Sequence, residues 1–274
     1  MLRPPYSEYD RLFVYNLGLD RLPPLDDPDL IGAWVEDGEA ILFFHRPKER
    51  LINELCQQTG ASLIYQADLD YQDWEAGHAI APFSVDGLTV APVWADGKAD
   101  IHLDPSVIFG SGFHPTTRLC LEILLKYLAE DAPVRSLLDL GSGTGLLAIA
   151  AARRGVPEVT AVDHNTLACE LLAANAERNG VADRLAIRQL DLRRECPDTR
   201  VDLVVANLYK GLLEQLFEQP AFWQAKTYII SGFVPAMEPD LLAALPTRGL
   251  RFLERQRREL WCLWVLRRRE ADAR

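Results

Sequence analysis

The residues with the clearest chemical meaning form a glycine-rich turn in the middle of the chain, Asp139-Leu140-Gly141-Ser142-Gly143-Thr144-Gly145. Glycines let a backbone turn sharply and approach a ligand closely. A dinucleotide fingerprint would need a glycine where this sequence has Leu146, and no phosphate-binding P-loop motif occurs. A carboxylate directly before the turn would repel a pyrophosphate but attract an ammonium group. We therefore expect a ligand with an ammonium group to contact Asp139, Gly141, Ser142, Gly143 and Gly145.

Two further carboxylates follow at the ends of the next two predicted strands. Asp163 comes 22 positions after Gly141, where a carboxylate can accept paired hydrogen bonds from the two hydroxyls of a ribose. Asp191 ends the following strand and could meet an adenine edge, although an ordinary turn role suits it equally well. An ammonium site beside a nucleoside site predicts S-adenosylmethionine as the cofactor.

A second polar segment, Phe109-Gly110-Ser111-Gly112-Phe113-His114-Pro115-Thr116-Thr117, precedes a predicted helix. Its glycines, histidine and hydroxyls could fold over a ligand. It could equally be a linker with an N-capping threonine and Pro115 in the first helical turn.

Together these segments resemble the PrmA family, which methylates a large-subunit ribosomal protein. The resemblance lies in Phe109 to Thr117, the glycine turn, Val162-Asp163 and Val205-Ala206-Asn207-Leu208, and it extends over about Asp73 to Arg267. It implies a class I methyltransferase fold and S-adenosylmethionine contacts at Thr117, Gly141, Asp163 and Asn207.

The expected chemistry is methyl transfer to a lysine or an N-terminal amine of a protein. Asn207 is the candidate that orients the incoming amine. His114 is a candidate base, but a role in ordering the loop or on the cofactor side is favoured over base catalysis. Four aromatic residues could wall the site and favour a cation through ring electrostatics: Trp94, Phe109, Phe113 and Tyr209.

Departures from the family pattern affect the substrate side. Phe113 replaces a small hydroxyl residue, Leu208 to Leu212 differ from the usual segment, and the N-terminal unit is shorter. The alternatives are therefore methylation of another protein, such as an electron-transfer flavoprotein subunit, or of a small molecule. A non-catalytic domain that only binds S-adenosylmethionine is a further alternative.

The composition limits the classes of partner and the cellular compartment that we expect for this protein. The net charge of −11 disfavours nucleic acid as the direct substrate, because neutralising phosphates requires clustered Lys and Arg. Five widely spaced cysteines without a CxxC pair argue against disulfides and a zinc site. We find no signal peptide and no apolar run long enough to cross a bilayer, so we expect a cytoplasmic protein without membrane contact.

Short apolar strands alternate with helical patterns from Pro115 onward, which predicts a parallel sheet covered on both faces. Strands are expected at 136–140, 158–162, 185–190, 201–206 and 227–231, and helices at 115–129, 146–154, 166–179, 210–218 and 235–245. The last two strands, at 249–256 and 259–267, are joined too tightly for a crossover and should pair antiparallel.

The predicted architecture is α/β: a class I methyltransferase with a mostly parallel seven-stranded sheet and a small α+β N-terminal domain. Residues 1–75 are expected to form that N-terminal domain, with three strands (11–17, 33–45, 62–67) and one helix that ends at Gly60. Residues 76–112 are expected to connect the two domains and to contain short strands at 88–91 and 100–103. Residues 113–274 are expected to form the catalytic domain.

Overall fold

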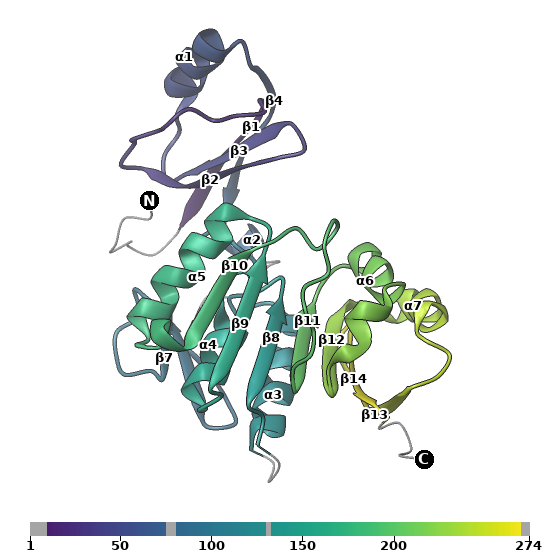
Figure 1. Ribbon diagram of the computed structural model, residues 1–274. Coiled ribbons are helices and arrows are strands. Elements are labelled where there is room, and N and C mark those ends of the chain that lie inside the picture. The colour runs from purple at the N-terminus through teal and green to yellow at the C-terminus, as the bar shows by residue number, and fades with distance from the viewer. Residues whose placement is uncertain (1–9, 75–80, 130–132, 270–274) are drawn as a thin grey trace.

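The computed structural model describes residues 10–74, 81–129 and 133–269. These residues form three sheets of four, three and seven strands (Figure 1). Parts of the expected N-terminal and connecting regions, including Glu75, Ala76 and Gly77, lie outside the described residues.

The N-terminal unit is a four-stranded antiparallel sheet in the order β2-β3-β1-β4. Its strands are β1 (Arg11–Gly18), β2 (Leu30–Glu36), β3 (Glu39–Phe44) and β4 (Ser62–Asp70). Helix α1 (Glu49–Thr59) packs Ile52 and Leu55 against it and ends, as expected, at Gly60 in the left-handed conformation. A short helix, α2 (Tyr71–Trp74), follows β4.

The number of N-terminal strands was predicted wrongly. The apolar stretch 33–45 was taken as one strand, but Asp37 (φ 51°) and Gly38 (φ 83°) break it into the hairpin β2–β3. Two consecutive positive φ angles at Asp-Gly are the signature of a two-residue type I′ turn. The Asp37-Gly38 dipeptide is a turn signal in the sequence, but the apolar residues on both sides of it favoured the interpretation as one continuous strand.

The connecting region forms a small sheet in the order β5-β6-β7, with β5 (Phe83–Val85), β6 (Leu88–Pro92) and β7 (Ile101–Leu103). The sequence predicted β6 and β7 and missed β5. Val85, Val90 and Ile101 belong to the same buried cluster as helices of the large sheet, so this region packs on the catalytic part.

The large sheet has the order β10-β9-β8-β11-β12-β14-β13. Its strands are β8 (Ser136–Leu140), β9 (Glu158–Asp163), β10 (Leu185–Gln189), β11 (Leu203–Asn207), β12 (Thr227–Phe233), β13 (Leu250–Arg258) and β14 (Trp261–Arg268). The first five pair in parallel and β13–β14 is an antiparallel hairpin, which confirms the predicted α/β fold. Strand order reverses between β8 and β11, and such a switch point is where open α/β sheets bind ligands.

The central strands are apolar on both faces, and a layer of helices covers each face of the sheet. Leucine- and alanine-rich α3 (Pro115–Leu128), α4 (Leu146–Arg153) and α5 (Thr166–Arg178) share one core cluster with the sheet. Helices α6 (Lys210–Phe217) and α7 (Glu238–Ala244) share the other (Figure 1). The expected helix at 235–245 begins with a short 3-10 turn, Pro235–Met237, before α7.

The N-terminal sheet docks on the outer side of α5. Leu12, Ile31 and Phe43 of that sheet share a buried cluster with Leu167 and Leu171 of α5. A Cβ at Gly32 in β2 would overlap the side chain of Leu167, so the strand lies against the helix without a side chain between them. This packing fixes where the β2–β3 turn lies.

Candidate functional site

A cavity of about 380 Å³ lies at the carboxyl ends of the parallel strands, beside the switch point between β8 and β11. Gly141 follows β8, Asp163 ends β9, Asn207 ends β11 and Gly232 lies near the end of β12; all four line the cavity. Its volume is within the range of pockets for cofactors and small ligands.

The glycine turn between β8 and α4 adopts a backbone that only glycine accepts easily. Gly141 (φ 68°) and Gly143 (φ 52°) are both left-handed, and a Cβ at Gly143 would overlap the carbonyl oxygen of Phe109. The turn is fixed to β9, since the amides of Gly141 and Ser142 donate to the carbonyl of Val162 at 2.8 and 3.1 Å. The turn is therefore closely packed against its neighbours, and Gly141 presents its backbone at the cavity wall without a side chain.

Asp163, the last residue of β9, presents its carboxylate to the cavity and holds the glycine turn. Its Oδ2 accepts from the amide of Gly143 at 2.9 Å, and its Oδ1 accepts from the amide of Asn165 at 3.0 Å. The side chain is only 11% exposed. A carboxylate has about four lone-pair sites, so each oxygen of Asp163 keeps one for a ligand hydroxyl.

Asp139 is buried rather than exposed to the cavity. It is 2% accessible, accepts from the backbone amide of Ala148 in α4, and its Oδ2 has no partner among the described residues. Burial raises the pKa of Asp139 to about 7. The expected contact between Asp139 and a ligand ammonium group therefore stays a prediction.

Asn207 is held by the first turn of α3. Its Nδ2 donates to the hydroxyls of Thr116 at 3.3 Å and Thr117 at 3.2 Å, and both threonines are buried. With the amide nitrogen committed, the carbonyl oxygen of Asn207 is the group left to accept a hydrogen bond. Thr117 itself does not line the cavity; it contacts the cavity residue Asn207.

His114 is the N-cap of α3. Its Nδ1 accepts from the amide of Thr116 at 3.3 Å and lies 2.8 Å from the Thr116 hydroxyl. In the neutral ring this leaves the proton on Nε2, so no nitrogen lone pair is free to act as a base. The ring packs edge-on against Trp261, with centroids 4.8 Å apart, and against Phe109 at 5.1 Å. These contacts favour the loop-ordering role, which the sequence analysis also preferred to base catalysis.

The aromatic wall differs from the predicted one. Phe109 and Tyr209 line the cavity, as expected, and Trp261 joins them. Phe113 is buried against Phe83 instead, and Trp94 packs on the cluster beneath the N-terminal sheet. Phe113 and Trp94 are therefore corrected to packing residues.

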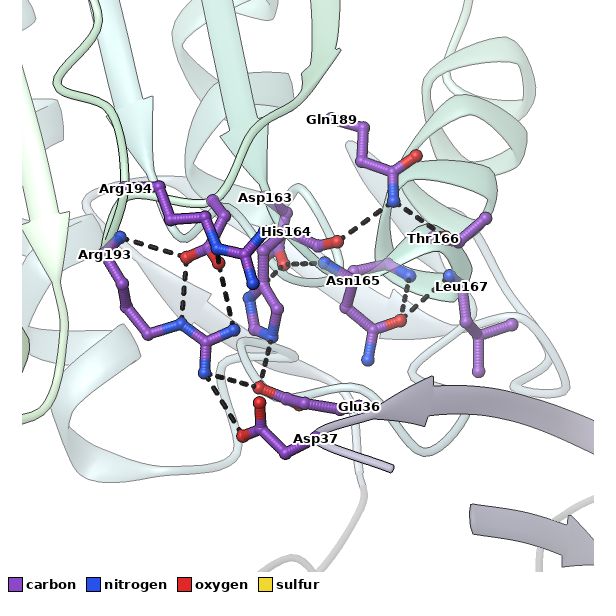
Figure 2. A network of polar contacts seen from close by, with 12 residues as sticks. Glu36, Asp37, Asp163, His164, Asn165, Thr166, Leu167, Gln189, Arg193 and Arg194 are labelled. Atoms are coloured by element: carbon purple, nitrogen blue, oxygen red, sulfur yellow. Dashed lines mark hydrogen bonds and ion pairs between the residues drawn. The ribbon is translucent and has the colours of Figure 1, made fainter. Parts of the chain in front are cut away.

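Asp191 lines the cavity within a network of charges (Figure 2). Its Oδ1 accepts from the amide and Nε of Arg193 at 3.0 and 2.9 Å, and its Oδ2 from the other arm of that guanidinium at 3.1 Å. Arg194 Nε lies 3.3 Å from the same Oδ2. Hydrogen bonds from Arg193 hold the pKa of Asp191 below its ordinary value, so the side chain is an anion at neutral pH.

Of the residues expected from the sequence, His114, Gly141, Asp163, Asp191 and Asn207 line the cavity. Thr117, Asp139, Ser142, Gly143 and Gly145 lie around it and shape the turn and α3. Sequence reasoning missed Glu36, His164 and Arg193 as lining residues. Glu36 lies far away in the chain and only the docking of the N-terminal sheet brings it here, so no local signal could have identified it.

A second cavity lies at the opposite end of the large sheet, where β11 and β12 begin. It is basic, with Lys226, Arg251 and Arg267 to Arg269 in its lining, and it contains none of the predicted site residues. Within residues 10–74, 81–129 and 133–269, no cluster of three or more potential metal ligands occurs. No helix in these same ranges is both long and apolar enough to cross a bilayer.

The switch-point cavity, its glycine turn and the carboxylate after β9 are the arrangement of a class I methyltransferase, and the protein is an S-adenosylmethionine-dependent enzyme of this class. The model of the family described as "Ribosomal protein L11 methyltransferase (PrmA)" matches residues 40–269, and the chain belongs to this family.

Individual relatives agree with that assignment. The chain is 32% identical to a ribosomal protein L11 methyltransferase of Brevibacillus brevis over 96% of this chain and 88% of that protein. A relative of the same name from Pelotomaculum thermopropionicum is 39% identical over 64% of this chain and 58% of its own length. The crystal structure of a ribosomal protein L11 methylase from Lactobacillus delbrueckii subsp. bulgaricus superposes with a TM-score of 0.60 at 26% identity, covering 69% of this chain and 100% of that one.

Proposed function

We propose that the protein methylates a lysine or N-terminal amine of a ribosomal protein, in the cavity between Asp163 and Asn207. The family match and the names of its relatives support the ribosomal substrate. The observation that carries the chemistry is the pairing of the Asn207 amide with two buried threonine hydroxyls, which leaves one fixed acceptor at the end of β11.

The cavity residues suit the nucleoside part of the cofactor. Asp163 keeps lone pairs for ribose hydroxyls, and Leu190, Leu192 and Leu208 supply an apolar surface for a flat base. The left-handed Gly141 leaves its backbone accessible at the cavity wall. When bound, S-adenosylmethionine supplies a methyl group on a positively charged sulfur.

The residues around Asn207 can prepare an amine for attack. An amine must lose a proton to solvent water before it acts as a nucleophile, and this loss becomes easier as the amine leaves water because desolvation lowers its pKa. Phe109, Tyr209 and Trp261 line the cavity, and Phe109 and Tyr209 are 51% and 59% exposed. A substrate amine is first attracted as a cation by the ring faces, and a substrate seated on these rings displaces water from them. The Asn207 carbonyl then accepts a hydrogen bond from the neutral amine and aligns it, so catalysis rests on alignment rather than on a dedicated base.

We also propose that residues 1–75 help to select the substrate and that the enzyme works in the cytoplasm. All five cysteines are free thiols, which a reducing compartment maintains.

The test is methyl transfer from labelled S-adenosylmethionine into a lysate of a strain that lacks this protein. We expect one labelled band in the ribosomal fraction, identified as a ribosomal protein by mass spectrometry. Label in a non-ribosomal protein or in the small-molecule fraction would contradict the proposed substrate.

Asn207→Ala tests the role of the amide. We expect the turnover to fall about 100-fold or more, because substrate alignment contributes several kcal/mol to catalysis, while calorimetry shows cofactor affinity within about threefold of wild type. Gln58→Ala, which removes an exposed amide of α1 outside the cavity, is the matched control. Equal losses of turnover and cofactor affinity in Asn207→Ala would contradict the proposed role.

A further inference from the structure

The β2–β3 turn of the N-terminal sheet reaches the wall of the cofactor cavity. Glu36, the last residue of β2, lines that cavity together with His164 and Arg193 of the catalytic part. Its Oε1 lies 3.2 Å from Arg193 and 3.0 Å from His164 Nε2, and Asp37 Oδ2 lies 3.4 Å from the same guanidinium arm. Figure 2 shows the turn meeting both side chains from below.

On the other side, Arg193 is bound to Asp191 through its backbone amide and two guanidinium nitrogens. These three bonds use three of the roughly four lone-pair sites that a carboxylate has, and Arg194 Nε lies 3.3 Å from the same Oδ2. In this arrangement Asp191 holds Arg193 at the cavity wall.

His164 makes a second link to the ribose side. Its Nδ1 lies 3.6 Å from Asp163 Oδ1, while its Nε2 contacts Glu36. The turn is thus connected both to the residue expected to hold the ribose and to the residue expected near the adenine.

The Glu36–Arg193 pair is the partly buried part of this network. The two side chains are 32% and 33% exposed, whereas Asp37 is 76% exposed. Partly buried charges in a network are coupled more strongly than isolated surface pairs, so Glu36 and Arg193 carry most of the coupling. The position of the turn is not left to the ion pairs, since β2 is packed on α5 through Gly32 and Leu167.

We propose that this ionic clasp, Glu36 and Asp37 on the N-terminal sheet with Arg193 and His164 on the catalytic part, closes the nucleoside end of the cavity. Glu36 and Arg193 are then positioning residues, and cofactor retention depends on the docked N-terminal sheet. The inference rests on the proposed placement of the nucleoside between Asp163 and Asp191, but not on the identity of the methyl acceptor.

The test measures the affinity of the full-length protein for two probes by calorimetry: S-adenosylmethionine and the neutral 5′-methylthioadenosine, which share the nucleoside. We expect Glu36→Gln and Arg193→Gln each to weaken both probes by about threefold to tenfold. The double variant should lose about as much as the weaker-binding single variant, because both changes open one clasp.

Glu54→Gln is the matched control, since it removes the same charge from the N-terminal unit at an exposed pair with Arg50. Its affinities should stay within twofold of wild type. Independent, multiplying losses in the double variant, or a Glu36→Gln affinity equal to that of the control, would overturn the clasp. Loss of S-adenosylmethionine affinity alone would also overturn it, since that result means a long-range charge effect on a cationic ligand.

The two proposals fail separately. The clasp is tested by cofactor binding without any acceptor, so a wrong methyl acceptor leaves this result unaffected. If the wild-type protein bound S-adenosylmethionine but not 5′-methylthioadenosine, the nucleoside placement would be wrong and the clasp would fall with it.

Discussion

At the scale of single residues, the polar groups of the site already form hydrogen bonds with one another in the absence of a ligand. Asn207 donates to Thr116 and Thr117, Thr116 contacts His114, and Asp163 holds the glycine turn. Such fixed partners limit the orientations that each group can take, which is how a site stabilises one ligand geometry. Asp139 is the exception, because it is buried and its Oδ2 has no hydrogen-bond partner in the part of the chain that the structure describes.

Asp139→Asn tests the consequence of that burial. The folded state raises the pKa of Asp139 from 3.8 to about 7, so between these values the folded protein keeps a proton that the unfolded chain has lost. The contribution of Asp139 to the free energy of unfolding is therefore most favourable to the folded state below about pH 4, and the free energy of unfolding falls as the pH rises to 7. We expect the free energy of unfolding of Asp139→Asn, relative to that of the wild type, to rise by a few kcal/mol between pH 4 and pH 7.

Urea unfolding at several pH values across that range measures this difference. An offset between variant and wild type that stays constant with pH would show that Asp139 is ionised throughout. The exposed pair partner Asp198 provides Asp198→Asn as a control for the general effect of removing a carboxylate.

At the scale of elements, α3 depends on its first turn. His114 caps the helix with a ring nitrogen, Pro115 occupies the next position, and the same turn supplies the hydroxyls for Asn207. A ring nitrogen in place of the usual Ser, Thr, Asp or Asn oxygen explains why the sequence pointed to a threonine cap instead.

His114→Asn and His114→Ala separate capping from base catalysis. Asparagine is a good N-cap, whereas alanine loses about 1 kcal/mol of stability. We expect His114→Asn to keep methyl transfer within about threefold of wild type and His114→Ala to lose both stability and activity. Thermal unfolding and initial rates measure the two effects; an asparagine variant as inactive as the alanine variant would assign His114 a chemical role.

At the scale of the whole molecule, the N-terminal sheet and the catalytic sheet are joined by one shared apolar cluster and by the charges around Glu36. The cluster holds the sheets together and fixes where the β2–β3 turn lies, and the charges then pair that turn with Arg193 and His164. The small sheet is thereby a structural neighbour of the cofactor site (Figure 1).

Leu167→Ala tests this joint. Leu167 is 5% exposed and packs on Gly32, so its truncation should cost about 2–5 kcal/mol at the interface. We expect hydrogen exchange to accelerate in β2 and β3 while β8 and β11 stay protected. Leu216→Ala, a fully buried leucine of the opposite cluster, should leave β2 and β3 unchanged. Equal acceleration in both variants would show that the molecule unfolds as one unit.

The sequence alone determined the order of strands and helices in the catalytic part. Strands of a parallel sheet that is buried on both faces are continuous apolar runs, and such runs can be recognised from the local sequence. It also predicted that the glycine turn, Asp163 and Asn207 lie together, because they follow or end the adjacent sheet strands β8, β9 and β11. The missed β5 and the split at Asp37-Gly38 are short local features within apolar surroundings.

Tertiary structure alone decided which distant groups meet. Arg193 and Asp37 lie 156 positions apart, and only the packing of β2 on α5 brings them into contact. The same holds for Trp261 beside His114 and for the burial of Phe113 and Asp139. Periodicity reports the face that a residue occupies, whereas its partners depend on how separate elements pack together.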